Sequence, residues 1–94
     1  MYATIRTYSG NPGLADALVE HQDEVKEVVG GIDGFNGYYV IKTDDGAATI
    51  SVYNSQEGTA ESTRAAAAWV GENLPQFAGS PPQVTSGEVV ISHS

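Results

Sequence analysis

The sequence contains no cysteine, which removes several classes of site at once. Disulfides, thiol catalysis, zinc–thiolate sites and iron–sulfur clusters are all excluded. A secreted domain this small often depends on disulfides, so the absence favours a cytoplasmic protein. At 94 residues, the chain is expected to form one domain, residues 1–94, with a single shallow core.

Basic side chains are also scarce, with 4 Lys and Arg against 12 Asp and Glu and a net charge of −8. Nucleic acids and anionic membranes are bound largely through Lys and Arg, so neither partner is expected. No apolar run approaches the roughly 20 residues that a membrane-spanning helix needs. The acidic composition therefore favours a soluble cytosolic protein.

What the sequence does contain is a regular succession of strand and helix patterns. Residues 2–8 alternate β-branched and aromatic side chains with period two, which predicts a strand. Apolar residues then recur at helical spacing from Leu14 to Val29, and Gly30 and Gly31 end this helix of about five turns. Residues 38–43 and 47–53 are strand-like and are joined by a hairpin signal at residues 44–46.

A second helix is predicted between a cap at Asn54 or Ser55 and a stop at Pro75, and a last strand covers residues 84–91. The order of elements is βαββαβ, the split βαβ pattern of ferredoxin-like α+β folds. Right-handed crossovers then give a four-stranded antiparallel sheet with both helices on one face.

The alternation divides the strand residues between two sheet faces. Ile5, Ile50 and Val52 are expected to face the helices because they are the most apolar set. The opposite face is then formed by Tyr2, Thr4, Arg6, Tyr8, Thr49, Ser51 and Tyr53. Its tyrosines and its lack of acids predict a sheet-to-sheet homodimer interface, and the alternative is an ordinary solvated face.

Three segments carry a resemblance to a known family: YATIR at residues 2–6, GIDGFNGY at 31–38 and AAWVGENL at 67–74. Together they resemble the dimeric α/β-barrel superfamily, in particular the antibiotic-biosynthesis-monooxygenase-like domains. The turn before Phe35 has Asp33 where the family usually has proline. The resemblance implies a homodimer with a pocket between the sheet and the helices.

The same superfamily includes cofactor-independent oxygenases of polycyclic phenols, haem-degrading oxygenases and muconolactone isomerases, so membership does not fix one reaction. The haem-degrading members carry an asparagine on the first strand and an axial histidine late in the chain. The first strand here has no asparagine, and His93 lies in the tail. Haem degradation is therefore not expected, and no cofactor is predicted.

His21 is the principal catalytic candidate, because it lies on the apolar stripe of the first helix between Leu18 and Val25. Histidine can act as a general base near neutral pH. The competing interpretation is a half-buried structural histidine bonded to a backbone group or a tyrosine. Glu20, Asp23, Glu24 and Glu27 on the same helix are better explained as a solvated face than as a metal site.

Trp69 resembles the tryptophan that lies near substrate in the oxygenase members, and it could line a pocket for an aromatic ligand or simply fill the core. Phe35, Tyr38 and Tyr39 could complete that pocket. Adjacent strand residues point to opposite faces, so only one of the two tyrosines can do so.

Arg6 is expected to form an ion pair across the dimer, or alternatively to clamp a substrate anion. By the alternation it would lie on the sheet face opposite His21 and Trp69. The sequence thus predicts a homodimeric small-molecule-binding domain and leaves open whether it is an enzyme. If it is catalytic, the expected reaction is cofactor-independent oxidation or isomerisation of a small aromatic or enolic compound. The alternative is a non-enzymatic homodimer that senses a ligand or has a structural role.

Overall fold

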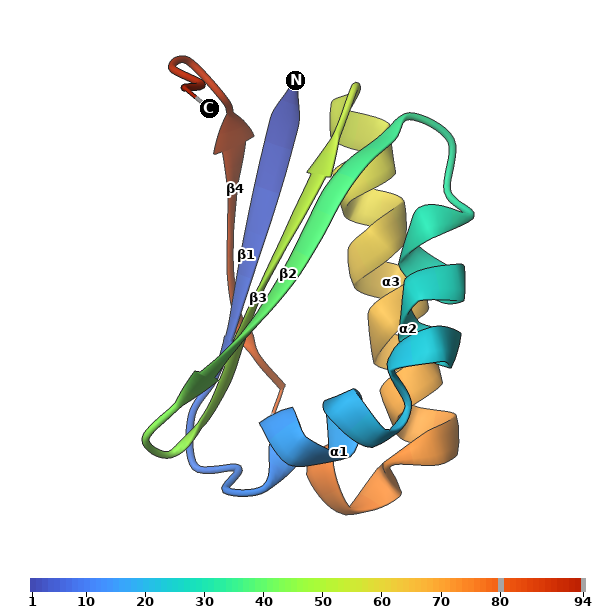
Figure 1. The fold of residues 1–94 in the computed structure, drawn as a ribbon, viewed down its shortest axis with the longest axis vertical. Coiled ribbons are helices and arrows are strands. Elements are labelled where there is room, and N and C mark those ends of the chain that lie inside the picture. The colour runs from blue at the N-terminus through green and yellow to red at the C-terminus, as the bar shows by residue number, and fades with distance from the viewer. Residues whose placement is uncertain (80, 94) are drawn as a thin grey trace.

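The computed structural model describes residues 1–79 and 81–93, which form a sheet covered on one face by helices (Figure 1). The strands are β1 (Tyr2–Tyr8), β2 (Phe35–Thr43), β3 (Gly46–Tyr53) and β4 (Gln83–Glu88), and the helices are α1 (Leu14–Glu20), α2 (Gln22–Gly30), α3 (Gln56–Asn73) and the short 3-10 turn η1 (Pro75–Phe77). The antiparallel sheet has the order β2-β3-β1-β4. The predicted ferredoxin-like fold is confirmed.

The first predicted helix is divided into two helices at His21. The backbone of His21 has φ −107° and ψ 22°, outside the helical range, and its N–H donates to the carbonyls of Ala17 and Leu18. The break turns the chain so that α1 lies along the lower part of the sheet while α2 runs beside α3 (Figure 1). Among the described residues, no helix is long and apolar enough to cross a membrane.

The junction between β3 and α3 is tightly packed. The Ser55 hydroxyl caps α3 by accepting a hydrogen bond from the Gly58 N–H at 3.3 Å, as the sequence predicted. A Cβ atom at Gly58 would lie 2.8 Å from the Cβ of Tyr53, so only glycine permits this approach. The fully buried Tyr53 donates its hydroxyl to the Val29 carbonyl at 2.7 Å and thereby ties β3 to α2.

The hydrophobic core lies between the helices and the sheet. Its buried members are Tyr8, Leu14, Ala15, Leu18, Val25, Ala47, Val70 and Leu74. Trp69 and Tyr38 are half-buried and pack against this cluster. Five of the eight members lie in α1, α2 and α3, Leu74 directly follows α3, and the strands contribute only Tyr8 and Ala47.

The two sheet faces are reversed relative to the sequence prediction. Arg6 is 1% exposed and donates to Ser62 and Thr63 of α3, whereas Ile5 is 42% exposed on the other face. The predicted dimer interface of Tyr2, Thr4, Arg6, Tyr8, Thr49, Ser51 and Tyr53 is therefore wrong, because these residues lie on the helix-covered face. Strand alternation shows which residues share a face, but it does not show which face the crossovers cover.

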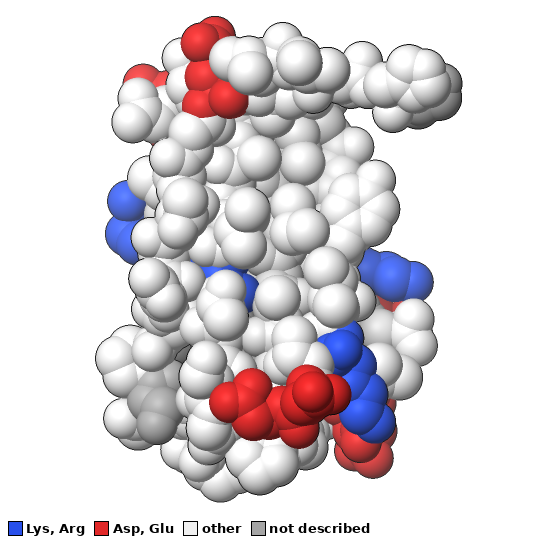
Figure 2. Space-filling model, turned by 90° about the vertical axis from the view of Figure 1, so that its left-hand side faces the viewer, with Lys and Arg blue, Asp and Glu red and all other residues white. Residues whose placement is uncertain are grey.

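Of the described residues that the strand register places on the face without helices, none is charged and most are apolar. Ile5, Tyr39 and Ile41 are 42%, 61% and 47% exposed there. By the strand register, this open face comprises Ala3, Ile5, Thr7, Gly37, Tyr39, Ile41, Ala48, Ile50, Val52, Gln83, Thr85 and Gly87. In Figure 2 the acidic side chains lie at the upper and lower margins of this view, and apart from one small basic patch near its middle the basic side chains lie at the edges.

Candidate functional site

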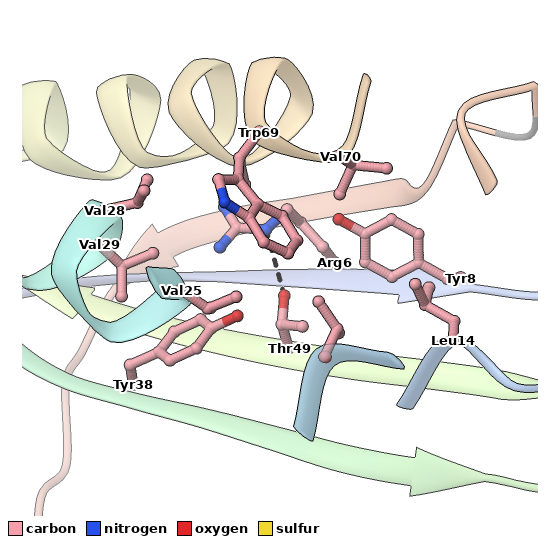
Figure 3. Close-up of a pocket in the computed structure, with 12 residues that line it drawn as sticks. Arg6, Tyr8, Leu14, Val25, Val28, Val29, Tyr38, Thr49, Trp69 and Val70 are labelled. Carbon is pink, nitrogen blue, oxygen red and sulfur yellow. Dashed lines mark hydrogen bonds between the residues drawn. The ribbon is translucent and has the colours of Figure 1, made fainter. Parts of the chain in front are cut away.

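Two of the predicted ligand residues, Trp69 and Tyr38, line the same small cavity under α2 and α3 (Figure 3). Its volume is about 20 Å³, which is the space of roughly one water molecule. The valines Val25, Val28, Val29 and Val70 form part of the remaining wall. The region around Trp69 is therefore closely packed, and an aromatic ligand could enter only if these side chains moved.

His21 contacts Trp69 but does not line this cavity. The two rings meet edge to face, with centroids 5.5 Å apart and planes at 70°. The His21 side chain is 37% exposed, and its Nδ1 atom lies 3.6 Å from a carboxylate oxygen of Glu24. The structure thus brings His21 and Trp69 together as predicted, at the outer end of the helix layer, and the role of His21 as a base stays a prediction.

Tyr39 and Phe35 lie away from both Trp69 and His21. Tyr39 points to the open face and is 61% exposed, so Tyr38 is the tyrosine of the pair that faces the core. Phe35 is 39% exposed and packs edge to face on Tyr53, with ring centroids 5.9 Å apart. In the described chain, these two residues do not contribute to a cavity wall.

A larger cavity of about 310 Å³ lies on the other side of α3, above β1 and β4. Ala67 and Val70 of α3 form one wall, and Val84 of β4 forms another. The remaining lining residues are Arg6, Tyr8, Thr63, Phe77, Ala78, Pro81 and Pro82. A pocket between the sheet and the helices was expected, but sequence reasoning missed that Ala67, Val70 and Val84 line it. Ala67 was a usable signal, since a small residue leaves space when no large residue faces it.

Arg6 contributes to the walls of both cavities, which corrects the expectation that it lies on the opposite side of the sheet from Trp69. Its guanidinium is held by four hydroxyl groups. Nε donates to Thr49 at 3.1 Å, and one terminal nitrogen donates to Ser51 at 2.7 Å. The other terminal nitrogen donates to Ser62 at 3.3 Å and to Thr63 at 2.9 Å.

The tyrosines beside Arg6 are neutral at ordinary pH. Burial raises the pKa of Tyr8, and the Arg6 charge offsets only part of this increase. Burial likewise raises the pKa of Tyr38 to about 12. In Figure 3 the Tyr8 hydroxyl points towards Arg6 and Trp69. Both phenols can therefore donate hydrogen bonds to a ligand, but neither supplies a negative charge to Arg6.

Comparison with known proteins supports the fold. No family model matches the sequence, and no curated protein matches it. Solved structures do match. One is a Nitrosomonas europaea protein assigned to the antibiotic biosynthesis monooxygenases, with a TM-score of 0.71 and 14% identity. The match covers 97% of this chain and 100% of that protein. A Streptomyces coelicolor monooxygenase in complex with Nanaomycin D matches with a TM-score of 0.61 at 19% identity, over 97% and 91%.

A third match is a haem degrader from Mycobacterium tuberculosis with two haems bound, at a TM-score of 0.61 and 17% identity over all of both chains. The residues of the present chain do not fit ligation of haem by histidine. His21 lies outside both cavities and His93 is exposed in the tail. This chain therefore shares the fold of the haem degrader, but within the described residues neither histidine lies at a cavity where it could bind haem.

Proposed function

We propose that this protein is a homodimeric domain that binds a small aromatic or enolic compound in the cavity between α3 and the sheet. The observation that carries the proposal is the cavity of about 310 Å³, with mostly apolar walls and two buried polar side chains, Arg6 and Tyr8, at its base. Ligand sites generally combine an apolar surface of this size with a few placed polar groups. The cavity is formed within one chain.

The open face of the sheet is the surface that supports pairing with a second copy. The chain carries a net charge of −8, so two copies repel each other wherever acids gather. The open face has no acid, and it exposes Ile5, Tyr39 and Ile41. A contiguous apolar surface without charge is typical of the buried part of a homodimer interface.

Pairing is tested by measuring the mass in solution, for which the single chain is 9.8 kDa. We expect twice that mass for the natural sequence and a shift to one chain for Ile5→Lys, because an unpaired charge would be buried at the interface. Val19→Lys is the matched control, since Val19 is 58% exposed on α1. A single-chain mass for the natural sequence at micromolar concentration would contradict pairing.

Ligand binding is tested with a neutral aromatic probe, 1-naphthamide, in a nuclear magnetic resonance titration. We expect the amide signals of Val70 and Val84 to shift. Ala67→Phe should abolish the shifts by filling the cavity, and Ala68→Phe is the control because Ala68 does not line it. Shifts that persist in Ala67→Phe would place the probe elsewhere and contradict the site.

The contact between His21 and Trp69 favours a second candidate, cofactor-independent oxidation or isomerisation with His21 as the proton acceptor. The cavity of about 20 Å³ beside Trp69 would have to open to admit a substrate. Activity on a phenolic substrate that is unchanged in both His21→Gln and Trp69→Phe would refute this second candidate.

A further inference from the structure

The guanidinium of Arg6 is buried without a counter-charge. Arg6 is 1% exposed, and every hydrogen-bond acceptor found for it is a neutral hydroxyl. Within residues 1–79 and 81–93, the ion pairs found are Lys42 with Asp16 and His21 with Glu24, and neither involves Arg6. Buried arginine is normally paired, because removing its charge from water is strongly unfavourable.

The missing partner does not reflect a shortage of acids. The chain has 12 Asp and Glu against 4 Lys and Arg, yet α3 presents Ser62 and Thr63 to Arg6, and β3 presents Thr49 and Ser51. Tyr8, the nearest ionisable neighbour in the larger cavity, is kept neutral by burial. The fold thus holds a fixed positive charge that the protein itself leaves unneutralised.

This charge lies at a cavity that a ligand can occupy. Arg6 has five N–H donors, of which four are used by the hydroxyl groups. The apolar part of the lining includes Val70 and Phe77 on the helix side and Val84, which pairs with Arg6 across β1 and β4. Tyr8 lies on the same wall as Arg6 and has a phenolic proton to donate.

We infer that the ligand of this cavity is an aromatic anion, a carboxylate or a phenolate, whose charged oxygen binds Arg6 and Tyr8 while its ring lies on Val70 and Val84. The inference rests on the proposed function, since it names the chemical class of ligand for that cavity. A charged hydrogen bond to arginine in a mostly apolar cavity gains more than a neutral one. Arg6 would then set specificity as well as affinity.

The test compares two probes of the same shape, 1-naphthoate and 1-naphthamide, in the same titration. We expect naphthoate to bind about tenfold to a hundredfold more tightly than naphthamide, the range of a charge-assisted hydrogen bond, and to shift the Arg6 Nε–H signal. Arg6→Met should bring the two affinities close together. Arg64→Met is the control for net charge, because Arg64 is exposed on α3, and it should keep the preference.

The outcomes separate this inference from the proposed function. Binding of both probes with equal affinity would refute the anion preference and leave the cavity as a ligand site. A preference that survives Arg6→Met, or that Arg64→Met also removes, would show that Arg6 is not its source. Binding of neither probe would refute the proposed function. If Arg6→Met does not fold, the natural sequence alone provides the test. Tighter binding of naphthoate with a shift of the Arg6 Nε–H signal would support the inference, and the absence of that shift would refute it.

Discussion

The charge of Arg6 should reduce the stability of the folded protein, and a variant that replaces Arg6 together with two of its four hydroxyl partners tests this. The variant combines Arg6→Met, Thr49→Val and Ser51→Ala, which removes the guanidinium together with the two hydroxyls for which Arg6 is the hydrogen-bond partner found. Ser62 and Thr63 can stay, because each also donates its hydroxyl to the Thr59 carbonyl, at 2.8 and 3.2 Å.

The magnitude follows from two contributions to the free energy of unfolding. Replacing buried charged groups by apolar side chains of similar volume is neutral or stabilising by about 1–4 kcal/mol. Removing both members of a hydrogen bond is close to neutral, whereas leaving one buried hydroxyl unpaired costs about 1–3 kcal/mol. We therefore expect the free energy of unfolding of the triple variant to equal or exceed that of the natural sequence. The free energy of unfolding of Arg6→Met alone should be lower than that of the triple variant by about 2 kcal/mol or more. The single substitution leaves the hydroxyls of Thr49 and Ser51, which are 2% and 0% exposed, without a hydrogen-bond partner.

The assay is urea unfolding followed by the fluorescence of Trp69, the single tryptophan, at one protein concentration for all variants. A triple variant less stable than the natural sequence by more than about 2 kcal/mol would refute the reasoning, because Arg6 would then be a net structural contributor. An equal or higher stability combined with lost anion preference would identify Arg6 as a residue kept for binding at a cost in stability.

Two further predictions concern the packing around this site. Gly58→Ala should destabilise the fold by at least about 1 kcal/mol in thermal unfolding, because the new Cβ would lie 2.8 Å from the Cβ of Tyr53. Gly71→Ala in the same helix is the control. Its new Cβ meets no atom within 4 Å, so this variant should be as stable as the natural sequence or more stable. Burial raises the pKa of Tyr38 from 10.0 to about 12, so the unfolded chain loses that proton first and stability should fall as the pH rises from 10 to 12. Tyr38→Phe should weaken this dependence in urea unfolding at several pH values, and an equal slope in both proteins would contradict it.

Much of the fold follows from local pattern. Period-two alternation identified β1 and β3, and the turn residues at 44–46 placed the hairpin where β2 and β3 meet. The Ser55 cap and the stop before Pro75 bounded α3 closely, because both act through the local backbone. The break at His21 had no such signal, since apolar residues continue at helical spacing on both sides of it.

The candidate site could be predicted only in part. Strand periodicity predicted that only one of Tyr38 and Tyr39 faces the core, and helix periodicity placed His21 and Trp69 on the helix side of the sheet but did not predict the contact between their rings. The residues that line the cavity above β4 could not be predicted in this way, because its walls come from β1, α3, η1 and β4, and β1 is far from the other three in the chain.

The sequence by itself determined the order of elements and which side chains share a sheet face, because both follow from local backbone periodicity. It grouped Arg6 with Tyr8 and Thr49 and separated them from Ile5. Only the tertiary structure decided that the helices cover the Arg6 side and leave Ile5 exposed. Apolar character alone favoured the reverse, but α3 presents the Ser62 and Thr63 hydroxyls to Arg6, so the polar face lies inside and forms the candidate site.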